Sequence, residues 1–359
     1  MLSTPKKRSF FTRELLHWNA RFNHRDMPWK HEKDPYKIWL SEIILQQTRV
    51  EQGREYYNRF VHAYPTVEQL AVAKDDDVYK LWEGLGYYSR CKNLLHTARE
   101  IVNKYAGVFP KTHEEIIQLK GIGPYTAAAI TSFAFQLPYA VLDGNVMRIL
   151  SRYFGISTAI DSTEGKKELA TLANSLLDTD APGIYNQAIM DFGATICKPK
   201  QPVCSNCLLA ENCTAFANGD TQGYPVKEKK VKQSSRWMYY FIAGYNDNYF
   251  IRKRTEKDIW FQLYEFVLIE TNDKKSIAQI LKLNAYKQLM PSTASITNTS
   301  EVYSHKLTHQ TLHVVVVEAH LQAGTKLNGY QLTARSQLKK LAFPKILSLH
   351  VEKMGKTKP

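Results

Sequence analysis

The stretch LKGIGPYTAAAI, residues 119–130, places two glycines between two helix-forming segments. Gly121 and Gly123 let backbone N–H groups approach an anion closely, and Pro124 suits the first turn of the helix that follows. The positive end of that helix adds to the same anion position. The stretch therefore predicts a hairpin turn between two helices that binds an anion such as a phosphate group. In the alternative interpretation, the glycines only allow two helices to pack tightly.

The hairpin lies within a long region of helical periodicity, which predicts an all-helical domain over residues 1–215. Its expected helices cover residues 9–22, 34–60, 66–84, 91–105, 112–119, 123–135, 145–155 and 162–177. Residues 216–235 are polar and Lys-rich and are expected to form a linker. Residues 236–359 are expected to form an α+β domain. Its predicted strands cover residues 236–245, 248–254, 264–270 and 311–321, and its predicted helices cover residues 276–289 and 336–343.

The composition favours a nucleic acid partner. Lys and Arg outnumber Asp and Glu by 48 to 34 among the 359 residues, which gives a formal net charge of +14. Such a charge attracts polyanions such as nucleic acid or an acidic membrane surface. The start, MLSTPKKRSFFTRELL, lacks the apolar core of a signal peptide, and no stretch approaches the about 18 unbroken apolar residues of a membrane span. We therefore expect a cytoplasmic, nucleoid-associated protein with no membrane segment.

Four of the five cysteines fall within CKPKQPVCSNCLLAENC, residues 197–213, while Cys91 stands alone. They form a C-x6-C-x2-C-x5-C array of Cys197, Cys204, Cys207 and Cys213. In a reducing compartment such a group is expected to bind metal rather than to form disulfides. Zinc is one candidate, but all-cysteine zinc sites usually come as two short C-x2-C pairs. A single compact loop with unequal gaps favours a [4Fe-4S] cluster instead.

The stretch WLSEIILQQTRV, residues 39–50, carries a carboxylate inside an apolar helix face. Ile38, Trp39 and Leu45 share that face with Glu42. Desolvation there is expected to raise the pKa of Glu42 and to keep its carboxyl group protonated. A protonated carboxyl group can act as a general acid. The alternative is a residue at the rim of the face, paired with a nearby Lys or Arg.

A second carboxylate occurs in VLDGNVMRIL, residues 141–150. Asp143 precedes Gly144, and Asn145 is expected to cap a helix over residues 146–154. The unpaired N–H groups and the dipole at the helix start are expected to keep Asp143 ionised. One protonated and one ionised carboxyl group are the pair that breaks a glycosidic bond. The alternative is an Asp that only caps the helix.

These motifs, in this order and on a helical frame, resemble the helix-hairpin-helix DNA glycosylase superfamily that includes endonuclease III. The motifs that carry the resemblance are LKGIGPYTAAAI, the LDGNV stretch and the cysteine loop. WLSEIILQQTRV, GLGYYSR and NQAIMDFGATIC are similar to one branch of it, the adenine DNA glycosylases. The similarity in layout covers roughly residues 10–350.

The resemblance implies catalytic roles for four residues. Glu42 matches the acid that protonates N7 of adenine and assists the attacking water, and Asp143 matches the carboxylate that stabilises the sugar cation. Tyr125 and Asn145 match residues that support them. In the endonuclease III branch the position of Tyr125 is a lysine that forms a Schiff base. The tyrosine therefore implies base removal without strong lyase activity.

The resemblance also implies a set of residues that bind the flipped adenine and its partner base. The residues that match the adenine pocket are Trp29, Leu45 and Gln187. Tyr87 matches an aromatic wedge beside the opposing base, while Gln47 and Thr48 match contacts to the base pair. Alternatively, one of Tyr87 and Tyr88 is a core aromatic at a helix start. Lys30 stands where the family usually has arginine, and a point charge cannot make the same planar contact.

The C-terminal domain resembles the Nudix-like module of this branch. The stretch DIWFQLYEFVLIETNDKK, residues 258–275, lacks the glycine-and-glutamate box that a working Nudix hydrolase needs to bind metal. A recognition role is therefore expected. Tyr303, Ser304 and His305 match the family's Phe-Ser-His loop that senses 8-oxoguanine opposite adenine, with Tyr in place of Phe.

We therefore predict a monomeric, monofunctional DNA glycosylase with a [4Fe-4S] cluster. Its expected substrate is double-stranded DNA that contains adenine opposite 8-oxoguanine or guanine. One alternative is a related glycosylase or lyase that acts on mismatched thymine or an oxidised pyrimidine. The other is a non-catalytic protein that binds damaged DNA with the same hairpin and wedge.

Overall fold

The computed structural model describes residues 4–228, 233–307 and 309–354. The chain divides into two compact units. The helical unit comprises Met1–Val72 and Asn93–Lys229. The sheet unit comprises Ala73–Lys92 and Lys230–Pro359, so a short segment from the N-terminal half groups with the C-terminal sheet. Within the described residues, no helix is long and apolar enough to cross a membrane.

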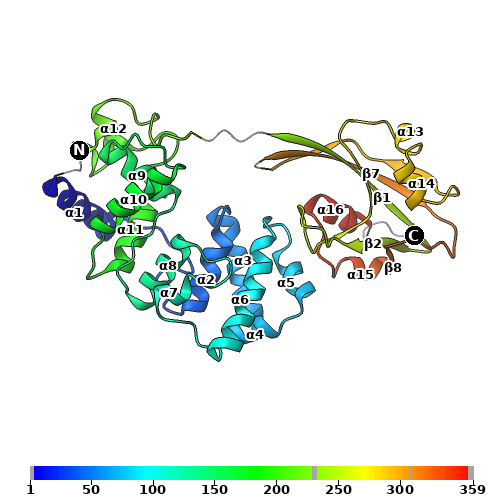
Figure 1. Cartoon of the computed structure of the whole chain (residues 1–359), viewed down its shortest axis with the longest axis horizontal. Helices are drawn as coiled ribbons and strands as arrows, with labels where there is room; N and C mark the ends of the chain where they lie inside the picture. The colour runs from blue at the N-terminus through cyan, green and yellow to red at the C-terminus, as the bar shows by residue number, and fades with distance from the viewer. Residues whose placement is uncertain (1–3, 229–232, 308, 355–359) are drawn as a thin grey trace. The chain divides into compact units, whose positions relative to one another are not determined.

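Helices build the first unit (Figure 1). They are α1 (Pro5–Phe22), α2 (Pro35–Leu45), α3 (Val50–Ala63), α4 (Val67–Val72), α6 (Ser89–Tyr105), α7 (His113–Ile116), α8 (Pro124–Phe135), α9 (Gly144–Phe154), α10 (Thr163–Leu176), α11 (Pro182–Thr195) and α12 (Thr214–Ala217), with α6 beginning in the sheet unit. Side-chain caps mark several starts, because the side-chain oxygens of Asp34 and Ser162 accept the backbone N–H groups of Tyr36 and Gly165. Two short 3-10 turns, Cys204–Asn206 and Ala210–Asn212, precede α12.

The structure divides the single helix that periodicity predicts over residues 34–60. α2 ends at Leu45, and Gln47 adopts a φ of +58°, which interrupts the helical hydrogen-bond series. α3 then packs closely on α2. A Cβ added at Gly53 of α3 would lie only 2.6 Å from Cδ2 of Leu45. The break leaves residues 46–48 lining the cavity of this unit.

Helix α11 is absent from the helices that periodicity predicts. Residues such as Tyr185, Ala188 and Phe192 are buried on several sides of it, together with the polar Asn186. A helix that is buried on most of its faces has no clear amphipathic stripe to detect.

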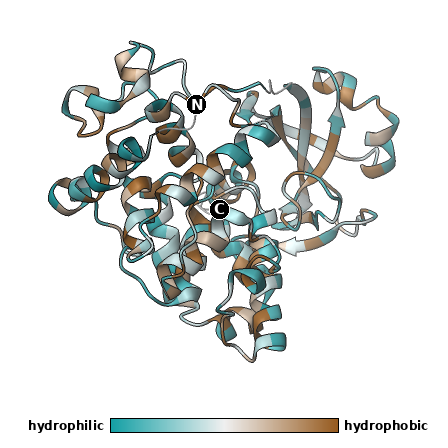
Figure 2. Cartoon of the chain, turned by 60° about the vertical axis from the view of Figure 1, so that its left-hand side comes forward, coloured by the Kyte–Doolittle hydropathy of each residue, from teal (hydrophilic) through white to brown (hydrophobic). Residues whose placement is uncertain are grey.

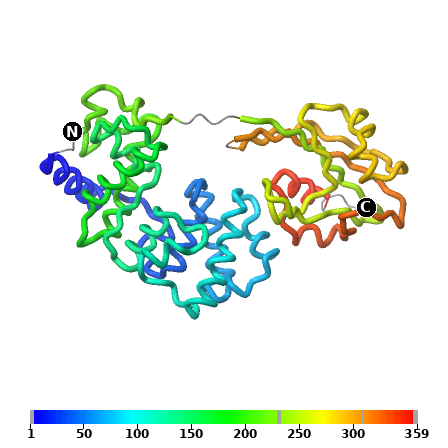
Figure 3. Tube along the Cα trace, viewed as in Figure 1, coloured from blue at the N-terminus to red at the C-terminus, as the bar shows by residue number. Residues whose placement is uncertain are grey.

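The core of the helical unit ties α1 to the later helices. Phe11, Leu15 and Trp18 lie one to two turns apart on α1 and are buried. Trp18 meets Phe192 of α11 edge to face, with ring centroids 5.0 Å apart. Figure 3 shows α1, in dark blue, beside the green helices of this unit. Each such buried side chain stabilises the unit by about 1.5–3 kcal/mol relative to exposure.

A mixed sheet forms most of the second unit (Figure 1). At its centre, β1 (Ser234–Tyr245) pairs in parallel with β7 (Gln310–His320). The antiparallel strands are β2 (Asn248–Lys253), β3 (Tyr264–Glu265), β4 (Val267–Thr271), β5 (Ser295–Thr299), β6 (Tyr303–Lys306) and β8 (Gln331–Ala334). The helices of this unit are α5 (Asp75–Trp82), α13 (Ile277–Ile280), α14 (Asn284–Leu289), α15 (Arg335–Leu338) and α16 (Lys345–Met354).

Strand β1 is buried on both faces, and Figure 2 shows apolar residues in brown along the strands. Phe241 packs with Tyr286 of α14 on one face, while Tyr240 belongs to the cluster on the other face that contains Leu347 of α16. A central strand that is covered on both faces has a continuous apolar sequence, as MYYFIAGY does. The expected fold class, an all-helical domain followed by an α+β domain, is confirmed.

Several predicted elements of the sheet unit are divided or missing. The predicted strand over residues 264–270 is interrupted at Phe266 between β3 and β4, and the predicted helix over 276–289 is divided into α13 and α14. Strands β5, β6 and β8 are short and largely exposed, so no apolar pattern marks them. Within the predicted linker, the backbone oxygen of Val226 accepts the N–H of Ile160 in the helical unit.

Candidate active site

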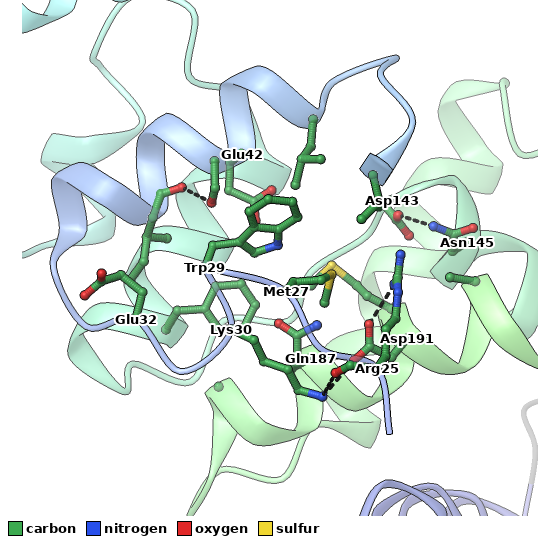
Figure 4. Close-up of a pocket in the computed structure, with 18 of the residues that line it drawn as sticks. Arg25, Met27, Trp29, Lys30, Glu32, Glu42, Asp143, Asn145, Gln187 and Asp191 are labelled. Atoms are coloured by element: carbon green, nitrogen blue, oxygen red, sulfur yellow. Dashed lines mark hydrogen bonds and ion pairs between the residues drawn. The ribbon is translucent and has the colours of Figure 1, made fainter. Parts of the chain in front are cut away.

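A cavity of about 550 Å³ opens in the helical unit, and Figure 4 shows Glu42 and Asp143 at it with Trp29 and Met27. Elements far apart in sequence build it, since α2, the loop before α9 and α11 all contribute. The residues at this cavity that the sequence analysis had selected are Trp29, Glu42, Leu45, Gln47, Thr48, Tyr125, Asp143, Asn145 and Gln187. A cavity of this size suits a nucleobase or nucleoside.

Glu42 lies on α2 with only 6% of its surface exposed. Its Oε2 accepts a hydrogen bond of 2.7 Å from the hydroxyl of Tyr125, which comes from α8. Its partner is therefore a hydroxyl group and not the Lys or Arg of the alternative interpretation. Burial raises the pKa of Glu42 to about 7, the hydrogen bond from Tyr125 opposes that rise, and the charge of Asp143 adds to it. A large fraction of this carboxyl group is thus protonated near neutral pH.

Asp143 itself is the N-cap of α9, whereas the sequence predicts Asn145 as the cap. Its Oδ1 accepts the N–H of Val146 at 2.7 Å, and its Oδ2 accepts Nδ2 of Asn145 at 2.8 Å. The helix therefore begins at Gly144, because the carboxylate satisfies the backbone donors from two residues further upstream than the expected cap, Asn145.

The environment of Asp143 differs from the one that the sequence predicts. Burial raises the pKa of Asp143, and the hydrogen bonds from Val146 and Asn145 lower it by less. The prediction considered the helix start alone, whereas the cavity wall also removes the carboxyl group from water. Two accepted hydrogen bonds and a lower ordinary pKa favour the ionised form of Asp143 more than that of Glu42.

Arg148 connects Asn145 to the cysteine loop. Its Nη2 donates to Oδ1 of Asn145 at 2.9 Å and to the backbone oxygen of Gly193 at 2.8 Å. Its Nε donates to the backbone oxygen of Cys197 at 2.9 Å. Sequence reasoning missed this residue, because nothing in VMRIL distinguishes an inward arginine from a solvated one.

The base pocket has an aromatic wall. Trp29 is buried and meets Tyr57 edge to face, with ring centroids 5.4 Å apart. Met27 and Gln187 lie near it (Figure 4). Flat apolar groups beside an amide are suited to stack on a base and to hydrogen-bond its edge.

A buried ionic cluster holds the loop that carries Trp29. Asp191 of α11 is fully buried, and its Oδ1 accepts Nη1 of Arg25 at 2.7 Å. Its Oδ2 accepts Nδ2 of Asn23 at 2.9 Å and lies 3.5 Å from Nζ of Lys30. Lys30 also donates to the backbone oxygen of Arg25 at 2.7 Å, so its ammonium group helps to hold the loop in place. Sequence reasoning missed Asp191, although it is a carboxylate inside an apolar helix, the same signal that selected Glu42.

Replacing Asp191 with Ala should lower the free energy of unfolding by about 3 kcal/mol, because two cations lose their buried partner. We choose the low end of the usual range because a quarter of the Arg25 side chain remains exposed and can be hydrated. Urea denaturation measures the change. The matched control is Glu168→Ala, an exposed position on α10 that should change stability by less than about 0.5 kcal/mol. Equal stability of both variants would contradict the conclusion that Asp191 holds this loop in place.

In the hairpin, the two glycines have different surroundings. Gly121 adopts a φ of +82°, and a Cβ there would lie 2.7 Å from Cβ of Asn93, so its absence serves backbone geometry and packing. Gly123 precedes α8, and a Cβ there would meet no atom within 4 Å. Close packing of the helices therefore accounts for the glycine at position 121. It does not account for Gly123, which lies beside open space at the start of α8.

The four clustered cysteines lie on the loop and 3-10 turns between α11 and α12. Nη1 of Arg152 lies 3.5 Å from Sγ of Cys197, and Sγ of Cys213 lies 3.6 Å from the backbone oxygen of Arg152. Burial is the main cause that raises the pKa of Cys204, and the charge of Cys197 adds to it, so these thiols lie within electrostatic reach of each other. In the described residues, no three His, Cys, Asp or Glu side chains converge as ligands of a single metal ion. Four thiols on one loop are a donor set for an iron–sulfur cluster or for a zinc ion.

The remaining predicted residues, Tyr87, Ser304 and His305, belong to the sheet unit. Tyr87 is 49% exposed while Tyr88 is buried, as the alternative interpretation expected for one of the two. Oγ of Ser304 lies 3.2 Å from Nδ1 of His313. Tyr87 and His305 line a second cavity in this unit, and Ser304 lies beside it on β6.

Two protein-family models match the chain. Residues 40–175 match the family described as "HhH-GPD superfamily base excision DNA repair protein", and residues 238–352 match the NUDIX domain. A structure of a thermostable thymine-DNA glycosylase is similar, with a TM-score of 0.56 and 32% identity over 59% of this chain and 98% of that chain. An endonuclease III–DNA complex shares the fold, with a TM-score of 0.54 and 19% identity over 61% of this chain and 99% of that chain. The fold and the site define a base excision DNA glycosylase, a hydrolase of N-glycosyl bonds.

Curated relatives narrow this class. The adenine DNA glycosylase of Buchnera aphidicola subsp. Acyrthosiphon pisum is 34% identical over 307 residues, which cover 85% of each chain. The human adenine DNA glycosylase is 39% identical over 237 residues, 61% of this chain and 43% of that protein. The chain belongs to the adenine DNA glycosylase family.

Proposed function

We propose that the enzyme removes adenine opposite 8-oxoguanine, and adenine opposite guanine, from duplex DNA. The observation that carries this proposal is one cavity shared by a buried Glu42 with a pKa of about 7 and a hydrogen-bonded Asp143. One group can give a proton while the other stays charged, which is the division of roles that glycosidic cleavage needs.

The proposed reaction begins with adenine flipped into the cavity against Trp29. The Glu42 carboxyl group donates its proton to N7 of adenine, and the C1′–N9 bond breaks with its electron pair going to the base. The Asp143 carboxylate stabilises the oxocarbenium ion that remains. Water then adds to C1′ and gives its proton to the Glu42 carboxylate, which restores the acid. Tyr125 holds Glu42 through its hydroxyl group.

The lysines of this cavity support a monofunctional enzyme. Tyr125 stands where the endonuclease III branch carries its Schiff-base lysine. Lys30 binds Asp191 and the backbone of Arg25, while Lys33 donates to the backbone oxygen of Phe133 at 3.2 Å. An ammonium group engaged in this way is a poor nucleophile.

The sheet unit is proposed to read the base opposite the adenine. Tyr87 wedges into the stack, Ser304 and His305 contact the 8-oxo base, and Gln47 and Thr48 contact the pair from the helical unit. Partial desolvation of the exposed imidazole lowers the pKa of His305, and the charge of Lys345 lowers it further, so a neutral imidazole faces the DNA. Backbone N–H groups near Gly121 and Gly123 bind a phosphate, and the chain acts as a monomer.

The decisive test is single-turnover base release from duplexes that differ only in the mispair. We expect release with adenine opposite 8-oxoguanine or guanine, and none with adenine opposite thymine. A duplex with thymine opposite guanine tests the second candidate, which the similarity to a thymine-DNA glycosylase structure favours. Release of thymine but not adenine would overturn the proposal.

We also propose that Cys197, Cys204, Cys207 and Cys213 bind a [4Fe-4S] cluster, with Arg152 beside Cys197. Such a cluster uses all four thiolates as ligands, and its positive core offsets part of their charge. The purified protein should be brown, with four iron and four sulfide ions per chain, and Cys204→Ser should lower both contents. A colourless protein with one zinc ion would overturn this assignment.

The rate of adenine release should fall as the pH rises through about 7, because Glu42 acts in its protonated form. One pH unit above the pKa, about a tenth of the acid remains protonated. The hydrogen bond from Tyr125 lowers the pKa of Glu42, so Tyr125→Phe should shift the alkaline limb to higher pH. Single-turnover rates across the pH range measure both effects. A rate that stays constant through pH 7 would contradict the role of Glu42.

A further inference from the structure

Helix α5 packs against strands of the sheet unit, and the carboxylate of Asp76 on this helix binds two partners there. Oδ1 of Asp76 lies 2.5 Å from Nζ of Lys253 on β2, and Oδ2 accepts the hydroxyl of Tyr264 on β3 at 3.0 Å. Burial raises the pKa of Tyr264 to about 12, and the hydrogen bond to Asp76 adds to the rise, so the phenol stays a donor. The neighbouring Asp77 is exposed.

A second pair of contacts fixes the other end of α5. Oε1 of Glu83, directly after the helix, accepts the N–H of Phe343 at 2.8 Å. Nζ of Lys80 donates to the backbone oxygen of Leu341 at 3.0 Å and lies 2.6 Å from Oε2 of Glu83. We call Asp76, Lys80 and Glu83 the α5 clasp. Its partners come from β2, β3 and the loop before α16, which are segments about 180 to 260 residues away in sequence.

The chain that leaves the clasp carries Tyr87 and is itself held in place. Nε1 of Trp82 donates to the backbone oxygen of Gly86 at 3.1 Å, and Arg90 donates to the same oxygen at 3.2 Å. Nζ of Lys92 lies 4.4 Å from the ring centroid of Phe261. The position of Tyr87 relative to the sheet therefore depends on α5.

Tyr87 and His305 both line a cavity of about 670 Å³ within the sheet unit. Trp260 and Phe261 form part of its aromatic wall. Lys92, Lys257, Lys306 and Lys345 also line it, so it combines flat apolar groups with positive charge. This chemistry suits a nucleobase with its flanking phosphates.

We propose that Asp76 and Glu83 are positioning residues for mispair discrimination: they dock α5 so that Tyr87 and the Trp260–Phe261 turn enclose the base opposite the excised adenine. The inference rests on the proposed function, and it adds the clasp and this aromatic turn to the residues that read the opposing base. Neither Asp76 nor Glu83 touches the DNA in this proposal. They act by fixing the position of the segment that carries Tyr87 and ends at Lys92.

The test compares single-turnover adenine release from two duplexes, with adenine opposite 8-oxoguanine or opposite guanine. The selectivity is the ratio of the two rates. Asp76→Ala and Glu83→Ala should each lower it about tenfold, which corresponds to ~1.4 kcal/mol. Asp77→Ala, which removes the same charge one residue away on α5, should leave it unchanged. Tyr264→Phe, which removes one hydrogen bond and no charge, should give a smaller loss.

A charge swap tests the contact itself. Asp76→Lys should lower the selectivity, and adding Lys253→Asp should restore part of it, because the ion pair forms again with reversed polarity. Circular dichroism and thermal melting verify that each variant is folded. Folded Asp76→Ala and Glu83→Ala variants with wild-type selectivity would overturn the inference, as would equal losses of rate on both duplexes. A wild-type enzyme that releases no adenine would instead overturn the proposed function, and the inference with it.

Discussion

Replacing Glu42 with Gln should reduce single-turnover adenine release by about 10²–10⁴-fold, the usual contribution of a general acid. The amide has nearly the same shape and still accepts the hydrogen bond from Tyr125, so the cavity should be preserved. It has no proton to donate to the base. Duplex binding should remain within a few-fold of wild type, because the phosphate contacts that supply most of the affinity lie elsewhere.

The matched control is Glu55→Gln, an exposed position on α3 with no role in the cavity. It should release adenine at the wild-type rate. Binding is measured by fluorescence anisotropy with the same duplex, so that loss of chemistry is separated from loss of affinity. Unchanged release by the Glu42 variant would remove this residue from the mechanism.

Asp143→Asn should slow release by about 10²–10³-fold, a loss typical of removing one preorganised electrostatic group. Asparagine caps helices about as well as aspartate, so α9 should keep its start while the cavity loses its negative charge. The oxocarbenium ion then forms without a counter-charge. Removal of Asp143 should also move the alkaline limb of the pH profile to lower pH, because its charge raises the pKa of Glu42.

The same change at Asp34, the cap of α2, separates capping from catalysis. Asp34→Asn should leave both the rate and the pH profile near wild type. If both variants lost activity equally, the effect at Asp143 would belong to helix capping and not to charge.

The order of elements could be predicted wherever one local signal dominates. Apolar periodicity marks helices such as α1 and α10, and the apolar run of β1 marks a buried strand. Prediction failed where the environment was uniform or polar. Helix α11 shows no distinct apolar stripe because most of its faces are buried, and β6 is exposed along its length.

The candidate site could be predicted in part for the same reason. Glu42 was detectable because a carboxylate in an apolar helix face is unusual in sequence. Arg148 and Asp191 were not selected, although both are buried and hydrogen-bonded beside the cavity. Their importance depends on which partners the fold brings within 3 Å, and no local pattern records that.

By itself, the sequence determined the residue types that can do the chemistry and the short motifs that carry them. Only the tertiary structure decided that Glu42 and Asp143 share a cavity, and that burial rather than the helix start dominates the pKa of Asp143. It also decided that α5 groups with the sheet. The physical reason is that desolvation and ion pairing depend on distances between residues far apart in the chain, which local propensity cannot encode.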